Sequence, residues 1–198
     1  MEPLWPLLAR FGQEHPAARL DVFVTDRRVD LIADGIDVAI HVARGGVEAP
    51  IGRLLARYRH RVIASPAFLA RHPMRTTADL AIVPSGCFRT RTGTPSIWTL
   101  RDEQVRLTPR LTTNDCLHLR RAALAGAVIS EVPPFLADGA IREGRLVSAL
   151  DAHPMPDREV RGVLLDTRLM PPLVELFLDT CAKSLPVELQ ALGALSAS

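Results

Sequence analysis

The hydrophobic rhythm of residues 20–42 constrains the fold more than any other feature of this sequence. Apolar residues recur at every second position over residues 20–24 and again over residues 36–42. Such alternation is typical of β-strands, whereas the apolar residues of the stretch 29–33 follow helical spacing. A strand, a short helix and a second strand predict a parallel pair joined by a crossover, because a tight turn cannot connect parallel neighbours.

The rest of the chain also alternates between strand-like and helix-like spacing of its apolar residues, which predicts an α/β protein. Further helices are expected over residues 4–11, from Ser65-Pro66, from Thr113 or Asn114 to residue 124, from Pro133-Pro134 and from Pro171-Pro172. Residues 81–109 have a poor pattern and are predicted to be loops, with Trp98 and Leu100 at one buried strand end. Two βα clusters on either side of these loops predict two lobes with a cleft, and open α/β sheets bind ligands at the carboxyl ends of their strands.

The final helix is expected to bury one stripe of side chains. The stripe consists of Leu173, Phe177, Leu178 and Cys181. Residues after Pro186 are small and weakly polar, so the sequence predicts a frayed tail there.

Composition excludes several classes of protein. The chain is 47% hydrophobic and 23% charged, with a net charge of +2, which argues against a polyanion binder driven by bulk charge. Three distant cysteines, Cys87, Cys116 and Cys181, favour neither a disulfide framework nor a zinc site. No apolar run approaches about 20 residues and the first residues do not resemble an export signal, so a cytoplasmic protein without membrane contact is expected. No cofactor and no metal are expected.

Four blocks of the sequence resemble the effector-binding domain of LysR-type transcriptional regulators. The first is TDRRVDLIADGIDVAIHV at residues 25–42, and the second is RVIASPAFLARH at residues 61–72. The third runs over residues 112–150 and contains a capped helix, a glycine-closed turn and a strand leading into a proline. The fourth, MPPLVELFLDTC at residues 170–181, is similar to the family's final helix. The blocks occur in the family's order and together span about residues 3 to 185.

This resemblance implies a type II periplasmic-binding-protein-like fold of two Rossmann-like lobes with an interlobe cleft. Lobe I would comprise residues 1–64 and 164–198, and lobe II residues 65–163. It also implies a small, anionic effector in the cleft and self-association as a dimer or tetramer. The family's winged helix-turn-helix, its linker helix and the first strand of lobe I are not in this sequence, so DNA would be bound only through a domain missing from this chain. An excised domain and a truncated gene product both fit.

Two candidate effector contacts lie in the first lobe. Thr25 ends a predicted strand, where its hydroxyl either caps the following helix or faces the ligand. His41 alternates with Ile40 and Val42 and therefore points to the other side of its strand. It is either a half-buried polar residue near a sheet edge or an effector contact that donates a hydrogen bond.

Five further candidates lie in the second lobe. Ser65 and Pro66 open a helix whose free backbone N–H groups suit a carboxylate, although simple capping explains them equally. Asn114 stands at another helix start and could donate a hydrogen bond to an anion. Val132 and Pro133 either line the cleft floor or pack in the core.

Other functions find less support in the residues. The arginine run at positions 53, 57, 59 and 61 has only Tyr58 as an aromatic neighbour, so a solvated strand face or a dimer rim is favoured over a nucleic-acid interface. No hydrolase, zinc-protease or nucleotide-binding motif is present, and Cys116 with His118 lacks a third partner, so no catalytic residues and no enzyme activity are expected. The leading hypothesis is a ligand-sensing domain, and the alternative is a stand-alone truncated regulator that oligomerises with full-length relatives. A solute-binding protein on the same fold should carry an export signal.

Overall fold

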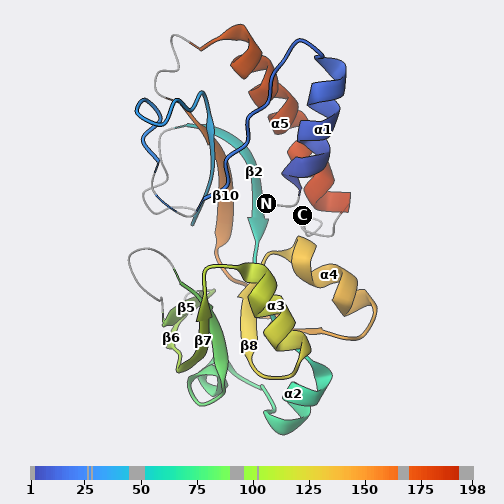
Figure 1. Ribbon diagram of the computed structural model, residues 1–198. Helices are drawn as coiled ribbons and strands as arrows, with labels where there is room; N and C mark the ends of the chain where they lie inside the picture. Colours follow the sequence, from blue (N-terminus) through green and yellow to red (C-terminus); the bar gives the residue numbers. More distant parts are fainter. Residues whose placement is uncertain are drawn as a thin grey trace. The chain divides into compact units, whose positions relative to one another are not determined.

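The structure, a computed structural model, divides the 198-residue chain into two compact units. It describes residues 3–25, 27, 29–44, 52–89, 96–101, 103–164 and 170–191. Unit 1 consists of Met1–Tyr58 and Asp157–Ser198, and unit 2 of Arg59–Pro156 (Figure 1). Each unit has its own sheet and its own buried residues.

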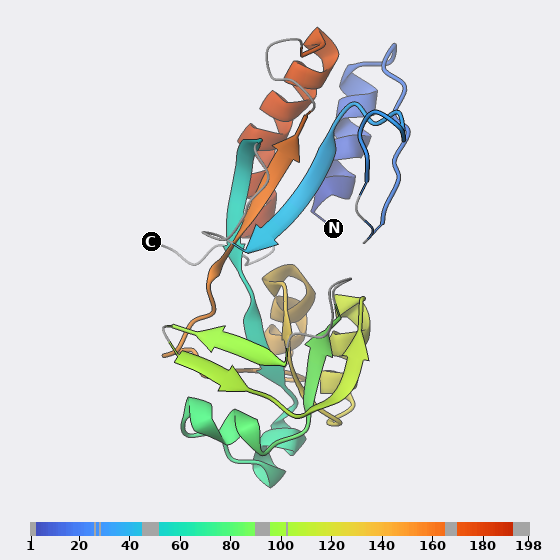
Figure 2. The same ribbon diagram turned by 90° about the vertical axis from the view of Figure 1, so that its left-hand side faces the viewer.

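Unit 1 is a three-stranded sheet covered by two helices. The strands, in spatial order, are β1 (Ala39–Arg44), β10 (Asp157–Val163) and β2 (Arg53–Arg59). Strand β1 runs antiparallel to β10, with His41 opposite Arg161. Helices α1 (Leu4–Glu14) and α5 (Pro172–Ala191) lie side by side against one face of this sheet (Figures 1 and 2).

The helices of unit 1 pack through apolar stripes, one of which differs from the prediction. Leu7 and Phe11 of α1 are buried, and the Phe11 ring meets the Phe177 ring edge-on at 5.3 Å between centroids. The buried stripe of α5 is Val174, Leu178, Cys181, Leu185 and Leu189. Leu173 is 46% exposed, so its predicted place in the stripe was wrong. The helix also continues through Pro186 to Ala191, because Leu185 and Leu189 beyond Cys181 are buried and anchor its last turns, so the frayed tail expected directly after Pro186 was wrong up to Ala191.

Unit 2 is built on a mixed five-stranded sheet. The strands, in spatial order, are β7 (Pro109–Thr113), β4 (Ser85–Phe88), β8 (Ile129–Val132), β3 (Arg61–Ala64) and β9 (Val147–Ala149). Strand β4 is parallel to both β7 and β8, whereas β3 is antiparallel to β8 and β9. Helices α3 (Cys116–Leu124) and α4 (Pro134–Arg142) pack against this sheet through a shared buried cluster. The cluster includes Ile63, Leu119 and Val132.

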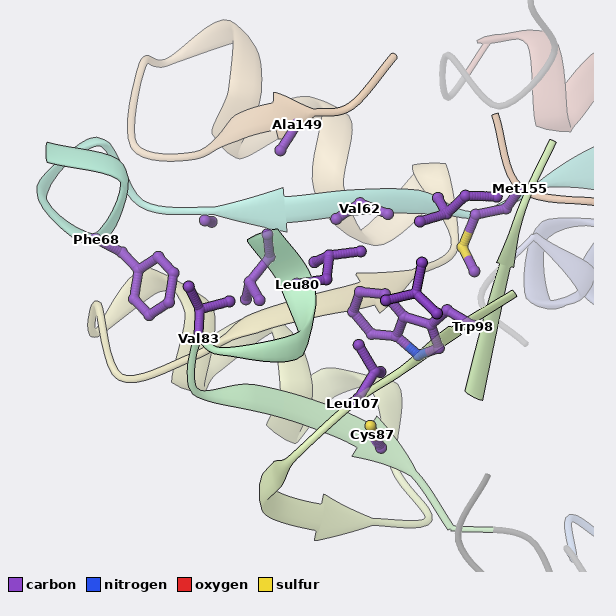
Figure 3. Packing of buried hydrophobic residues seen from close by; sticks show 13 residues of the cluster. Val62, Phe68, Leu80, Val83, Cys87, Trp98, Leu107, Ala149 and Met155 are labelled. Atoms are coloured by element: carbon purple, nitrogen blue, oxygen red, sulfur yellow. The ribbon is translucent and has the colours of Figure 1, made fainter. Parts of the chain in front are cut away.

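A second buried cluster of unit 2 contains the large side chains of Trp98 and Phe68 (Figure 3). It is built around Trp98 and includes residues of helix α2 (Pro66–Arg71), the short 3-10 helix η1 (Thr77–Ala81) and the hairpin of β5 (Ile97–Leu100) and β6 (Glu103–Arg106). The burial of Trp98 and Leu100 in a strand was predicted correctly. The prediction of loops over residues 81–109 was wrong, because β4, β5 and β6 lie there. These strands are only four residues each, which is too short to show a clear period.

The strand–helix–strand unit predicted over residues 20–42 is formed only in its last part. Strand β1 is present, but residues 20–24 are in no strand and residues 31–35 form a turn instead of a helix. The Asp30 carboxylate accepts hydrogen bonds from the amides of Ile32 and Ala33, and Gly35 adopts a positive φ of 64°. The predicted parallel pair is therefore wrong, since β1 pairs with β10 in the antiparallel sense.

The division into units falls at different residues from the expected lobes. Residues 61–64 form β3, which pairs with β8 and β9 of unit 2, and residues 157–163 form β10 in the sheet of unit 1. The chain passes from the sheet of unit 1 to that of unit 2 at His60, between β2 and β3, and it returns between β9 and β10.

Candidate functional site

The carboxyl ends of three strands meet at one edge of the unit 2 sheet. Because β7, β4 and β8 run parallel, the residues that follow them emerge together: Asn114 after β7, Arg89 after β4 and Pro133 after β8. We call this region the carboxyl edge. Ligands of open α/β sheets bind at such edges, because loops and helix starts there can be varied without disturbing the core.

Apolar residues form one side of the carboxyl edge. Val132 is fully buried at the end of β8, and Pro133 is buried as the N-cap of α4. Since Pro133 and Pro134 have no amide hydrogen, the start of α4 offers fewer donors than an ordinary helix N-terminus. This part of the edge therefore offers few donors to an anionic group, and Val132 packs in the core cluster with Ile63 and Leu119, one of the two alternatives left open for it.

Polar residues at the start of α3 form another side. The N-cap is Asp115, whose Oδ1 accepts from the Leu117 amide at 2.8 Å, so the predicted cap at Thr113 or Asn114 was wrong. The Thr113 hydroxyl accepts from the Asp115 amide at 3.2 Å and lies 3.5 Å from Nδ1 of His118. Asn114, next to these groups, is exposed. The capping arrangement places amide and hydroxyl groups of this loop at the carboxyl edge.

Arg89 supplies a cation that the sequence reasoning missed. Its backbone amide donates to the carbonyl of Thr113 at 2.7 Å, which places Arg89 beside the start of α3. Arg89 is exposed, and among the residues described here no carboxylate lies within ion-pair distance of it. The available signal was the short run Ser85–Phe88 before it, whose first three residues are buried.

Ser65 and Pro66 lie away from the carboxyl edge. They follow the end of β3, which runs antiparallel to β8, so they lie toward the opposite edge of the sheet from Val132. Ser65 is the N-cap of α2, with Oγ accepting from the Phe68 amide at 3.2 Å, and Pro66 is the first residue of the helix. The predicted capping geometry is confirmed, and the structure brings Asn114, Val132 and Pro133 together without these two residues.

Thr25 and His41 belong to unit 1. Thr25 is exposed and outside any helix or strand, and its hydroxyl accepts from the Arg27 amide at 3.1 Å. His41 is exposed in β1, and its cross-strand neighbour is Arg161. Their proposed contact with an effector stays a prediction.

An ion-pair network lies beside His41 on the unit 1 sheet. The carboxylate of Glu159 accepts from Arg57 at 2.9 Å and from Arg161 at 2.8 Å, and Arg161 also donates to the Gly52 carbonyl at 2.9 Å. Hydrogen bonds from Arg161 and then from Arg57 lower the pKa of Glu159 below its ordinary value of 4.5. Arg53 pairs with Asp179 and Arg61 with Asp138, so these members of the arginine run are held in ion pairs within the protein.

The network makes stability depend on pH in a predictable direction. Because the folded pKa of Glu159 lies below its unfolded value, the unfolded chain binds more protons between the two values and stability falls as pH drops through them. We expect Glu159→Gln to lower the urea midpoint at pH 7, and the difference from wild type to shrink below about pH 4. The exposed Glu175 of α5 supplies a matched control, Glu175→Gln. A constant difference between wild type and Glu159→Gln from pH 7 to pH 3 would contradict this reading.

The start of α3 brings a histidine close to a carboxylate and a hydroxyl. His118 lies 3.8 Å from the Asp115 carboxylate and 3.5 Å from the Thr113 hydroxyl. Among the described residues, no three histidine, cysteine or acidic side chains gather as metal ligands would. No helix in the described part of the chain is long and apolar enough to cross a membrane.

Residues 2–186 match the family described as the LysR substrate binding domain. The regulator PtxR of Pseudomonas aeruginosa is 28% identical over 89% of this chain and 58% of its own length. The regulator CrgA of Neisseria meningitidis serogroup B is 32% identical over 74% of this chain and 50% of its own length. This chain thus spans about half the length of the curated relatives that it matches.

The fold also matches a solved regulatory domain. The regulatory domain of CrgA from Neisseria meningitidis, 28% identical, covers 92% of this chain and 91% of its own with a TM-score of 0.69. Together with the family match, this likeness confirms the type II periplasmic-binding-protein-like α/β fold expected from the sequence. The curated relatives named above are transcriptional regulators.

Proposed function

Because this chain belongs to the LysR substrate-binding domain family, we propose that it senses a small anionic effector for a LysR-type transcriptional regulator. The observation that carries this proposal is the carboxyl edge of unit 2. There Arg89, which has no carboxylate within ion-pair distance among the described residues, lies next to the polar start of α3, at the same edge as the buried Val132 and Pro133. A cation beside an apolar surface suits a carboxylate attached to a hydrocarbon portion.

Each residue has a distinct role in this proposal. Arg89 would pair with the anionic group, Asn114 would fix its orientation by a hydrogen bond, and Val132 with Pro133 would contact the hydrocarbon portion. Thr25 and His41 are proposed to complete the contacts from unit 1. Ser65 and Pro66 would support α2 by capping, which is compatible with an indirect role.

The effector is proposed to act by shifting a conformational equilibrium. A ligand that binds one arrangement of the two units more tightly than another changes the population of the two arrangements. That change would alter how a dimer or tetramer presents DNA-binding parts, which lie outside this chain. The proposal includes no chemical step and no cofactor, and a regulator of transcription would act in the cytoplasm, where the DNA is.

Calorimetric titration with a panel of small aromatic and aliphatic carboxylates tests the proposal. At least one should bind, and Arg89→Met should weaken its binding about 10- to 100-fold, since a charge-assisted hydrogen bond contributes ~1.5–3 kcal/mol. Arg142→Met, which removes an exposed arginine in the last turn of α4, should leave the affinity unchanged. No binding by a folded protein, or equal losses in both variants, would count against an anion site at this edge.

A further inference from the structure

A buried histidine and a buried carboxylate form a pair where the chain enters unit 2. His60 lies between β2, which belongs to the sheet of unit 1, and β3 of unit 2 (Figures 1 and 2). Its Nδ1 lies 3.3 Å from Oε2 of Glu131, and only 10% and 7% of the two side chains are exposed. We call residues 59–61 the first connection. Because Glu131 belongs to β8, the pair joins the first connection to the sheet of unit 2.

The register of β3 and β8 places this pair beside the carboxyl edge. Arg61 is opposite Val132 in the antiparallel pairing, so the next two positions across the strands are His60 and Pro133. Glu131 comes directly before these edge residues in β8. The pair therefore lies where the first connection meets the end of β8, and a change in the pair acts on the connection itself.

Burial makes the contact sensitive to the charge of the histidine. A carboxylate taken out of water is costly unless positive charge and hydrogen bonds balance it. A protonated His60 supplies both to Glu131, whereas a neutral His60 supplies at most a neutral hydrogen bond. Histidine is the side chain whose charge ordinarily changes near neutral pH. The contact between His60 and Glu131 should therefore weaken as pH rises.

The chain also contains an exposed pair of the same kind. Nε2 of His118 lies 3.8 Å from a carboxylate oxygen of Asp115, and 59% and 48% of these side chains are exposed. Water and salt screen an exposed pair, so it holds its two partners together only weakly. His118 therefore supplies a matched control for a histidine near a carboxylate without burial.

Other charged and titratable groups surround the buried pair. Arg61, on the same strand as the pair, is bound to Asp138 of α4 at 2.6 Å. On β4, burial, together with the nearby charge of Glu131, raises the pKa of Cys87 to about 11. The Cys87 thiol therefore keeps its proton near neutral pH and does not change the charge around Glu131 there.

The remaining groups follow β9 or adjoin the two connections. Asp151 is exposed and follows β9, the other neighbour of β3, and His153 lies in the turn after it. The ends of β2 and β10 contribute Tyr58, Arg59, Asp157 and Arg158. Aspartate, tyrosine and arginine ordinarily change charge outside the range of pH 6 to 8.5. His153 is the residue of this group that needs its own control.

We propose that protonated His60 fastens the first connection to β8 through Glu131 and releases it as pH rises, so that the domain responds to pH as well as to an effector. The bound ligand in this response is a proton, which His60 takes from and returns to water. The first connection is one of two places where the chain passes between the units, and such short segments take up the backbone change when units move. The response needs no effector.

Hydrogen exchange without any ligand tests the fastening. Protection factors of the amides of residues 61–63, corrected for the intrinsic pH dependence of exchange, are measured by NMR at pH 6 and pH 8.5. In the wild type they should fall about tenfold between these values, since an ion pair is replaced by a neutral hydrogen bond. Amides of α5 in unit 1 should change less than about twofold.

A double-mutant cycle isolates the pair from other effects of each substitution. Glu131→Gln and His60→Gln keep hydrogen-bonding groups but remove the charge, and each should lower protection of residues 61–63 about tenfold at pH 6 and little at pH 8.5. The double variant should exchange at pH 6 as either single variant does, because both substitutions remove one interaction. His118→Gln and His153→Gln should keep the pH dependence of the wild type.

Three results would overturn the proposal. They are wild-type protection that is equal at the two pH values, losses at pH 6 that add in the double variant, and loss of the pH dependence in His153→Gln. The first comparison uses the wild type alone, so it decides the question even where a variant does not fold. A failure of every carboxylate to bind would contradict the effector proposal and leave these measurements unaffected.

Discussion

Replacing Trp98 with alanine is expected to lower the free energy of unfolding of unit 2 by about 3–5 kcal/mol. Trp98 is 1% exposed and joins the β5–β6 hairpin to the buried cluster of the sheet, close to Met155 and Leu107 (Figure 3). Its removal would leave a cavity that neighbours from several elements cannot all move to fill. Because the hairpin forms a two-stranded sheet of its own, its attachment depends on such side-chain contacts.

Hydrogen exchange during a urea titration measures the loss of stability of unit 2 separately from unit 1. Amides of β3 and β8 should exchange at lower urea concentration in Trp98→Ala than in wild type, while those of α5 in unit 1 report a separate unit. Ile82→Ala, at a position 84% exposed, should change stability by less than about 0.5 kcal/mol. Equal stability of Trp98→Ala and Ile82→Ala would show that the hairpin is not held by Trp98.

Gly162→Ala and Leu178→Ala are each expected to destabilise unit 1. The double variant should lose much less stability than the sum of the two single losses. A Cβ on Gly162 of β10 would collide with Cδ2 of Leu178 and lie 3.6 Å from Cδ1 of Leu55. We expect about 1–3 kcal/mol of destabilisation from this overpacking, and about 2–5 kcal/mol from Leu178→Ala, since Leu178 is fully buried. In the double variant the new methyl group occupies space vacated by the leucine, so the coupling should be about 1–3 kcal/mol.

Urea unfolding of the wild type and the three variants gives this coupling as a double-mutant cycle. Gly139→Ala serves as a control of opposite sign, because a Cβ there meets nothing within 4 Å and the residue lies inside helix α4. Alanine is favoured over glycine in a helix by about 0.5–1 kcal/mol. Additive effects at positions 162 and 178 would mean that α5 does not approach β10 as closely as described.

The local signals of the sequence were reliable where one residue type sets the backbone. Ser65 followed by Pro66 predicted the start of α2, and the observed cap is the Ser65 hydroxyl. The spacing of Leu7 and Phe11 predicted the buried face of α1. At the carboxyl edge, Asn114, Val132 and Pro133 were proposed from the same kind of signal, and the parallel strands bring them together. Arg89 was missed, because strand β4 before it is too short to show a period.

The sequence by itself determined the family, the α/β class and the capped start of α2, since these depend on patterns of residues close together in the chain. Only the tertiary structure decided which strands pair, that the chain changes sheets at His60, and that residues 20–24 lie in no strand of the described part of the chain in spite of their alternating pattern. The physical reason is that a strand is stabilised by hydrogen bonds to a neighbour distant in sequence, so its periodicity shows that it can pair but not whether a partner is present.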